Sequence, residues 1–265
     1  MTAELLGLQV PTTPWIEVEH LRRAANAAVA QPGDRPWRLW PVDRGVELRA
    51  ESVRSLPSSP AGAAAVRVAA GAALLNMRLT VAAMGDRPVT TLLPDPARPR
   101  VLAVVRRGKR SDPTPAEREL ADTIGRAARR CPEIGLRPVP DGIRNLVRRA
   151  AEAEGVWLRS VVDAGDREQL IGAVPSVGGR RCSGLVAVIG SNYDVPAMQL
   201  RVGQGVQRVV LTAVALGFAA RVVAWPPDLR AALGLPGSVG GPGLCPQAIL
   251  EVGWPLTRRA RLLEG

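Results

Sequence analysis

The chain has 265 residues, 46% hydrophobic and only 3% aromatic, so it can build one large domain or two half-size ones around an aliphatic core. Its net charge is +11, and Lys109 is the only lysine, so arginine carries almost all of the positive charge. With His20 as the only histidine, the composition argues against a histidine-dependent catalytic triad and a histidine-rich site, and we predict no metal centre.

Neither a nucleic-acid surface nor a membrane segment is expected. The arginines are scattered through predicted helices, without a basic strand studded with aromatic residues. The most apolar stretch, 209–220, is too short to span a bilayer, and residues 1–7 lack the features of a signal peptide. Three widely separated cysteines without a CxxC spacing argue against disulfides and a zinc knuckle, so we expect a cytoplasmic protein. Two explanations of the arginine content stay open, a GC-rich genome and the binding of anions.

Helices and strands alternate along the first 110 residues. Thr13 and Pro14 predict the start of a helix that runs to about Ala30. Gly85 is expected to end the long helix of this region in a left-handed conformation. The other predicted elements are a hairpin of 36–42 and 45–50, the long buried helix 61–84, and strands 88–93 and 101–106.

The polar segment 108–114 is the expected join to a second region of similar composition. Thr114 followed by Pro115 predicts a capped helix directly after it. The other predicted elements are helices 115–130 and 140–154, strand 156–161, helix 166–173, a glycine-rich loop at 177–182, strand 185–189, a long helix ending at Gly217, and strands 219–225 and 248–252. We therefore predict an α+β fold with long central helices.

The chain repeats at an offset of 132 residues, where 71–85 aligns with 203–217 and keeps a glycine at both ends. Chance similarity between two Ala-, Val- and Leu-rich helices is one explanation, and duplication is the other. A duplicated chain would form two pseudo-symmetric halves whose interface is a natural place for a ligand. We predict such halves at 1–110 and 111–265, the second with a basic tail, forming one compact internal pseudo-dimer that is monomeric.

Four segments carry a resemblance to a known family. Residues 28–38 resemble the flavin-binding stretch of the nitroreductase family, and 71–96, 202–217 and 246–259 resemble segments of its Acg-like branch. The resemblance implies two fused nitroreductase-like halves, each with a mostly antiparallel sheet and a long central helix. It implies FMN between them and NAD(P)H-dependent reduction of nitro or quinone-like substrates. It indicates no catalytic side chain.

The flavin-binding stretch departs from the family pattern. Val29-Ala30 stands where the family has Pro-Ser, Gly33 replaces its Asn, and Arg35 replaces its Gln. These replacements remove a hydroxyl and two amides, whereas arginines that resemble FMN-phosphate ligands remain before Pro138 and in the tail. The predicted cofactor-contacting residues are Ala30, Gly33, Arg35, Arg126, Arg129, Arg130, Arg258 and Arg259.

Two functions from different classes remain open. The retained arginines favour an FMN-binding oxidoreductase with weak or lost turnover, whereas the altered stretch favours a cofactor-poor relative that sequesters flavin or acts as a regulatory or stress-associated binding protein. Arg126 and Arg129 are also consistent with a solvated helix end, where cations suit the helix dipole. The tail arginines are also consistent with simple exposure. Arg35 could pair with the phosphate or block the flavin ring.

Overall fold

The computed structural model describes the helices, strands and most connections of the chain. The described residues are 18–30, 35–43, 45–51, 59–128, 133–135, 137–174, 184–226, 229 and 243–256.

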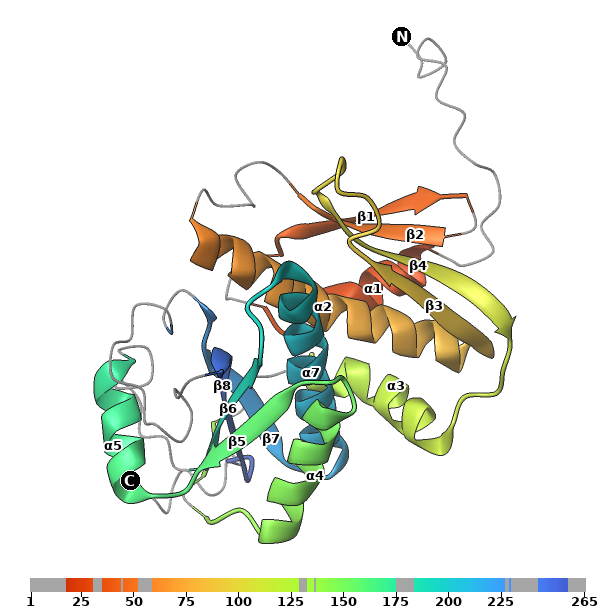
Figure 1. Cartoon of the computed structure of the whole chain (residues 1–265). Helices are drawn as coiled ribbons and strands as arrows, with labels where there is room; N and C mark the ends of the chain where they lie inside the picture. Colours follow the sequence, from red (N-terminus) through yellow and green to blue (C-terminus); the bar gives the residue numbers. More distant parts are fainter. Residues whose placement is uncertain are drawn as a thin grey trace, which may run out of the picture.

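The first sheet is antiparallel and contains the predicted hairpin (Figure 1). Its strand order is β1-β2-β4-β3, and β1 pairs with β2 from Trp37 opposite Ala50 to Val42 opposite Gly45. The elements of this region are α1 (Val18–Asn26), β1 (Trp37–Val42), β2 (Gly45–Ala50), α2 (Pro60–Ala83), β3 (Asp86–Leu92) and β4 (Val101–Arg110).

The second sheet has the same strand order as the first when the four strands of each sheet are numbered in chain order. It is also antiparallel and runs β5-β6-β8-β7. Its region contains α4 (Asp141–Glu152), β5 (Trp157–Val161), α5 (Ala164–Ala173), β6 (Leu185–Ser191), α7 (Pro196–Ala215), β7 (Ala219–Ala224) and β8 (Cys245–Gly253). Helix α3 (Pro115–Ala127) connects the two regions. Helices and two antiparallel sheets in the described residues confirm the α+β prediction.

Helices α2 and α7 pack against each other at the centre of the molecule (Figure 1). Ser59 caps α2 by accepting the amide of Gly62, and the helix is followed by Gly85 at φ 81°. Gly217 follows α7 at φ 82°, so both long helices end in the left-handed conformation that glycine adopts without strain. Among the described helices, α2 alone is long and apolar enough to cross a membrane, but 78% of that stretch is buried in the protein, as in a core helix.

The crossing of α2 and α7 is built on two glycines in reciprocal contact. A Cβ at Gly71 would lie 2.1 Å from the Leu200 carbonyl oxygen, and one at Gly203 would lie 1.9 Å from the Val68 carbonyl oxygen. Arg67 also donates a hydrogen bond to the side chain of Gln199. Arg67 and Gln199 are 132 residues apart, as Gly71 and Gly203 are. The close approach therefore joins positions that are separated by the same offset of 132 residues that the sequence shows.

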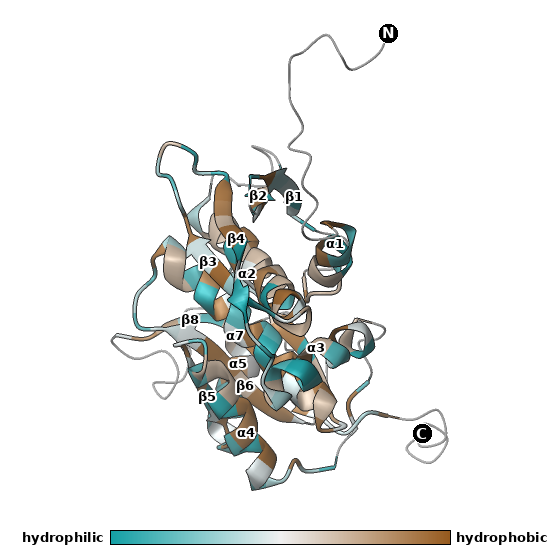
Figure 2. Ribbon diagram, turned by 90° about the vertical axis from the view of Figure 1, so that its right-hand side faces the viewer, coloured by the Kyte–Doolittle hydropathy of each residue, from teal (hydrophilic) through white to brown (hydrophobic). Residues whose placement is uncertain are grey.

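The core is continuous through both regions. One cluster of buried side chains contains Leu48 and Leu102 from the first sheet, Leu250 from the second, and residues of α2 and α7. Figure 2 shows hydrophobic residues along the central helices and hydrophilic ones on the outward sides of α3 and α4. The two regions therefore share one hydrophobic interior.

Two predicted boundaries were wrong. Helix α1 ends at Asn26 and not at Ala30, because the amide of Val29 bonds the side chain of Gln207 and leaves the helical ladder. The predicted start at Thr13 lies outside the described residues. Strand β4 continues to Arg110 and not only to Arg106, so 108–110 belong to the sheet, although Lys109 and Arg110 are exposed as predicted. Asp86 pairs with Arg110 there and forms an ion pair of 2.6 Å with Arg107.

Candidate functional site

The segment after α1 is held by a chain of buried amides that we call the amide junction: Ala24, Val29, Asn76 and Gln207. Asn76 Nδ2 donates to the Ala24 carbonyl over 2.8 Å, and Gln207 Nε2 donates to Asn76 Oδ1 over 3.0 Å. The backbone amide of Val29 donates to Gln207 Oε1 over 3.0 Å. Asn76 and Gln207 are both 0% exposed. Because buried polar groups are costly without partners, these bonds fix the start of the α1–β1 loop on α2 and α7.

The end of α3 lies beside the same loop. Ala27 and Ala127 pack against one small hydrophobic cluster formed by Leu75, Leu79, Leu120, Ile124 and Leu211. Arg126, in the last turn of α3, is exposed and donates to the Thr123 hydroxyl over 2.7 Å. Ala27, just before the predicted flavin-binding stretch, and Ala127, next to Arg126, thus pack against the same cluster of α2, α3 and α7 side chains.

Three of the predicted cofactor-contacting residues lie in the described part of the chain. Ala30 is half-buried and packs against the core, Arg35 is exposed, and Arg126 is placed as above. Arg35 makes no hydrogen bond or ion pair in the described structure. Gly33, Arg129, Arg130, Arg258 and Arg259 lie outside the described residues.

The described residues match the phosphate end of FMN better than its ring. Arg126 has no carboxylate partner and Arg35 has no polar partner among the described residues, so both guanidinium groups are available to an anion. Ala30 offers an apolar wall without a side-chain donor, and the Val29 amide is already used by Gln207. A ring bound here would rely on packing and on groups outside the described residues.

A second junction lies where the turn after α4 meets α2 and α7. In this ionic junction, the Glu154 carboxylate accepts two hydrogen bonds. Arg78 NH1 donates to Oε2 over 2.7 Å, and Arg208 Nε donates to Oε1 over 2.7 Å. Arg78 also donates to Gln204. Glu154 is only 5% exposed, and two arginines offset the cost of burying its charge.

Glu117, near the start of α3, lies within the field of the ionic junction. The backbone amide of Thr114 lowers the pKa of the Glu117 carboxyl, the Thr114 hydroxyl adds to this, and Arg208 and Arg78 contribute smaller attractions against the opposing effect of partial burial. The Thr114 hydroxyl also caps the Glu117 amide, which completes a capping box. The predicted cap at Thr114 is therefore confirmed.

A polar cavity of about 310 Å³ lies beside the ionic junction. Thr90 Oγ1 is buried there without a partner, and Arg201 has no polar partner among the described residues. The lining residues are Arg78, Pro88, Thr90, Leu92, Ala153, Glu154, Arg201 and Gln204. The cavity can take a small polar molecule between the two regions.

The sequence prediction missed both junctions, although a signal existed for three of their residues. Asn76, Gln204 and Gln207 are uncharged polar residues inside helices that are otherwise buried, and each such residue needs an internal partner. Glu154 gave a weaker signal, as an acidic residue after an arginine-rich helix. Within the described residues, no group of three or more His, Cys, Asp or Glu side chains is placed to hold a metal ion.

Comparison with solved structures finds proteins of similar fold. No family model matches the chain, and no curated protein matches it. A crystal structure from Parabacteroides distasonis, described as a candidate NADH dehydrogenase/NAD(P)H nitroreductase, aligns with a TM-score of 0.41 and 19% identity. The alignment covers 53% of this chain and 89% of that one.

Proposed function

We propose that this chain is an FMN-binding oxidoreductase of nitroreductase-like architecture, with weak or lost turnover. The observation that carries the proposal is the shared packing of Ala27 and Ala127 against one cluster. Because Ala27 precedes the predicted flavin loop and Ala127 follows Arg126, this packing supports a site shared by the loop and the end of α3. When bound, FMN would supply the redox chemistry, taking hydride from NAD(P)H and reducing a nitro or quinone-like acceptor.

The proposal includes a pseudo-symmetric origin for the architecture. Identical strand order in the two sheets and the reciprocal contact of Gly71 and Gly203 support two fused halves, 1–110 and 111–265. Such a chain reproduces a dimer internally, so we expect it to be a monomer. The cofactor would lie between the halves, where Val29 at the start of the α1–β1 loop bonds Gln207 of α7.

A second candidate is a cofactor-poor binding protein with the same architecture. It is favoured by the amide junction, because Gln207 already satisfies the Val29 amide and holds the loop without any ligand. In this case the chain would sequester flavin weakly, or bind a regulatory partner, without redox turnover.

Titration of the purified protein with FMN and with riboflavin, followed by quenching of flavin fluorescence, separates the candidates. If arginines hold the phosphate, FMN should bind more tightly than riboflavin. Arg126→Ala should weaken FMN binding by roughly tenfold or more, the loss of a charged hydrogen bond, and leave riboflavin unchanged. Arg118→Ala is the matched control, an exposed arginine on the same helix that bonds a backbone carbonyl.

The outcomes are distinct. Absence of FMN quenching by the folded wild-type protein would rule out the flavoprotein candidate. FMN binding without NAD(P)H oxidation in the presence of a quinone would support the binding protein. Equal effects of Arg118→Ala and Arg126→Ala would show that the phosphate lies elsewhere.

A further inference from the structure

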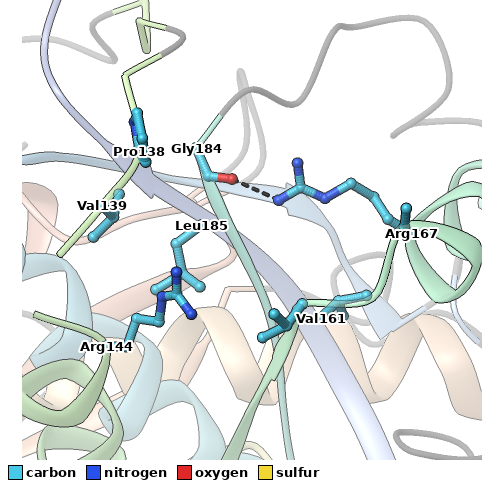
Figure 3. A pocket seen from close by; sticks show the side chains of 9 residues that line it. Pro138, Val139, Arg144, Val161, Arg167, Gly184 and Leu185 are labelled. Carbon is cyan, nitrogen blue, oxygen red and sulfur yellow. Dashed lines mark hydrogen bonds between the residues drawn. The ribbon is translucent and has the colours of Figure 1, made fainter. Parts of the chain in front are cut away.

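The second region contains a cavity of about 270 Å³ that neither junction lines (Figure 3). It is formed by the segment before α4, by α4 and α5, and by the facing ends of β5 and β6. Its lining residues are Pro138, Val139, Arg144, Val161, Val162, Ala164, Arg167, Gly184 and Leu185. From this lining, we propose that the cavity binds a small carboxylate that carries an apolar body.

The floor of the cavity is apolar and its charged groups all have one sign. Val139, Val161 and Leu185 are buried and leave no polar side chain on the floor. The guanidinium groups of Arg144 and Arg167 approach this floor from opposite sides, as Figure 3 shows. No Asp or Glu is among the lining residues. Two cations over an apolar floor favour an anion with a hydrophobic part.

Arg144 is only partly satisfied within the described structure. Its NH1 lies 3.2 Å from Asp141 Oδ1, but the Asp141 side chain is 85% exposed, so solvent screens this pair. Its Nε is buried without a hydrogen-bond acceptor. A carboxylate in the cavity would supply that acceptor and a charge partner together.

Arg167 is held in place from the other side. Its NH2 donates to the Gly184 carbonyl over 2.7 Å, and the Gly184 amide donates to the buried carboxylate of Glu251 over 3.2 Å. A Cβ at Gly184 would lie 2.3 Å from the Val252 carbonyl oxygen, so the start of β6 is fixed against β8. One guanidinium is therefore positioned before any ligand arrives, which lowers the entropic cost of binding.

The acidic residues near the cavity in the described chain are Asp141, Asp163 and Asp166, exposed or partly exposed at the starts of α4 and α5, and the buried Glu251, which accepts the Gly184 amide and pairs with Arg221. The Asp163 carboxylate caps α5 by accepting the Asp166 amide. The cavity beside β1 and β2 differs, because Arg38, Arg49 and Arg98 there pair with Glu47 or Glu51. Glu51 lines that cavity and Glu47 pairs with two of its arginines, whereas no carboxylate is among the lining residues of the α4–α5 cavity.

The test uses benzoate as the probe, titrated into the whole protein and followed by calorimetry and saturation-transfer NMR. Benzoate should bind, benzamide should bind much more weakly because it lacks the charge, and inorganic phosphate should not compete because it lacks the apolar body. Arg144→Gln should weaken benzoate by roughly tenfold or more. Arg148→Gln, one turn further along α4 and paired at the surface with Glu152, should leave it unchanged.

A second variant protects the test if Arg144→Gln does not fold. Val162 lines the cavity and is 68% exposed, so Val162→Glu adds a negative charge there without disturbing the core. It should weaken benzoate binding and leave the unfolding temperature unchanged. The proposal is overturned if folded wild-type protein does not bind benzoate, if Arg148→Gln is as harmful as Arg144→Gln, or if Val162→Glu has no effect on binding.

Discussion

The segments after α1 and α4 meet the same two helices, one through neutral amides and the other through charges. At the amide junction, Asn76 and Gln207 satisfy each other and the loop backbone, and both are fully buried. At the ionic junction, Glu154 holds two arginines beside a polar cavity. Two segments can therefore be joined to the same pair of helices by unlike chemistry, provided that the buried polar groups of each junction find partners.

Both junctions depend on the close approach of α2 and α7, so the largest expected effect comes from Gly203→Ala. The added methyl would meet the Val68 carbonyl oxygen at 1.9 Å, and only movement of a helix backbone can relieve this. We expect a loss of about 3 kcal/mol or more in the free energy of unfolding, at or beyond the upper end for overpacking. Urea denaturation measures it.

Gly142→Ala is the control for that variant, because a Cβ there meets nothing within 4 Å. It should leave stability unchanged or raise it by up to ~1 kcal/mol through helix propensity. Equal destabilisation by both alanines would contradict the crossing described here.

Glu154→Gln tests the ionic junction alone. It leaves Arg78 and Arg208 partly buried without an anion, and because both remain partly exposed we expect a loss of about 2 kcal/mol, below the usual cost of breaking a buried pair. Glu152→Gln breaks only the surface pair with Arg148 and should cost less than about 0.5 kcal/mol. If Glu154→Gln lowers the free energy of unfolding by no more than Glu152→Gln does, the ionic junction does not stabilise the fold.

Gln207→Leu tests the amide junction. The Val29 amide and Asn76 Oδ1 lose their partner, which should cost about 1–2 kcal/mol in the free energy of unfolding. Changing Asn76 to Leu as well should cost less than the sum of the two single changes, because the residues share one hydrogen-bond chain.

The two junctions should respond differently to salt. Raising ionic strength toward about 1 M should reduce the cost of Glu154→Gln and leave that of Gln207→Leu unchanged, since only the first involves charges. The same response in both variants would erase the distinction between them.

The smallest effect is a pH dependence at the start of α3. The pKa of the Glu117 carboxyl lies below its usual value, chiefly because the Thr114 amide bonds its charged form. Its contribution to stability is therefore complete above the ordinary carboxyl pKa of about 4.3 and is lost as pH falls through the lower folded value.

Thr114→Ala should cost about 0.5–1 kcal/mol near neutral pH, as for other helix caps. The difference from wild type should shrink in acid, where Glu117 becomes protonated. Unfolding temperatures measured across acidic pH for both proteins provide the check. A difference that stays constant would show that the Thr114–Glu117 bond does not depend on the charge.

Sequence reasoning succeeded where local signals were strong. The hairpin at 36–50, the capped helix after Thr114 and the long helix before Gly85 all form as predicted, because turns, caps and apolar runs act over a few residues. It failed at Asn26, where α1 ends, because the group that draws Val29 out of the helix belongs to Gln207, 178 residues away. For the proposed cofactor site, it predicted Ala30, Arg35 and Arg126 but not the amides that anchor the loop.

The sequence by itself determined the α+β class and the two long buried helices, because composition, hydrophobic period and glycine positions are local properties. Tertiary structure alone decided that Gln207 meets Val29, that Glu154 meets Arg78 and Arg208, and that Arg144 and Arg167 line one cavity. These partners lie far apart in the chain. Their pairing depends on the crossing at Gly71 and Gly203 and on the order of the strands, which local patterns do not contain.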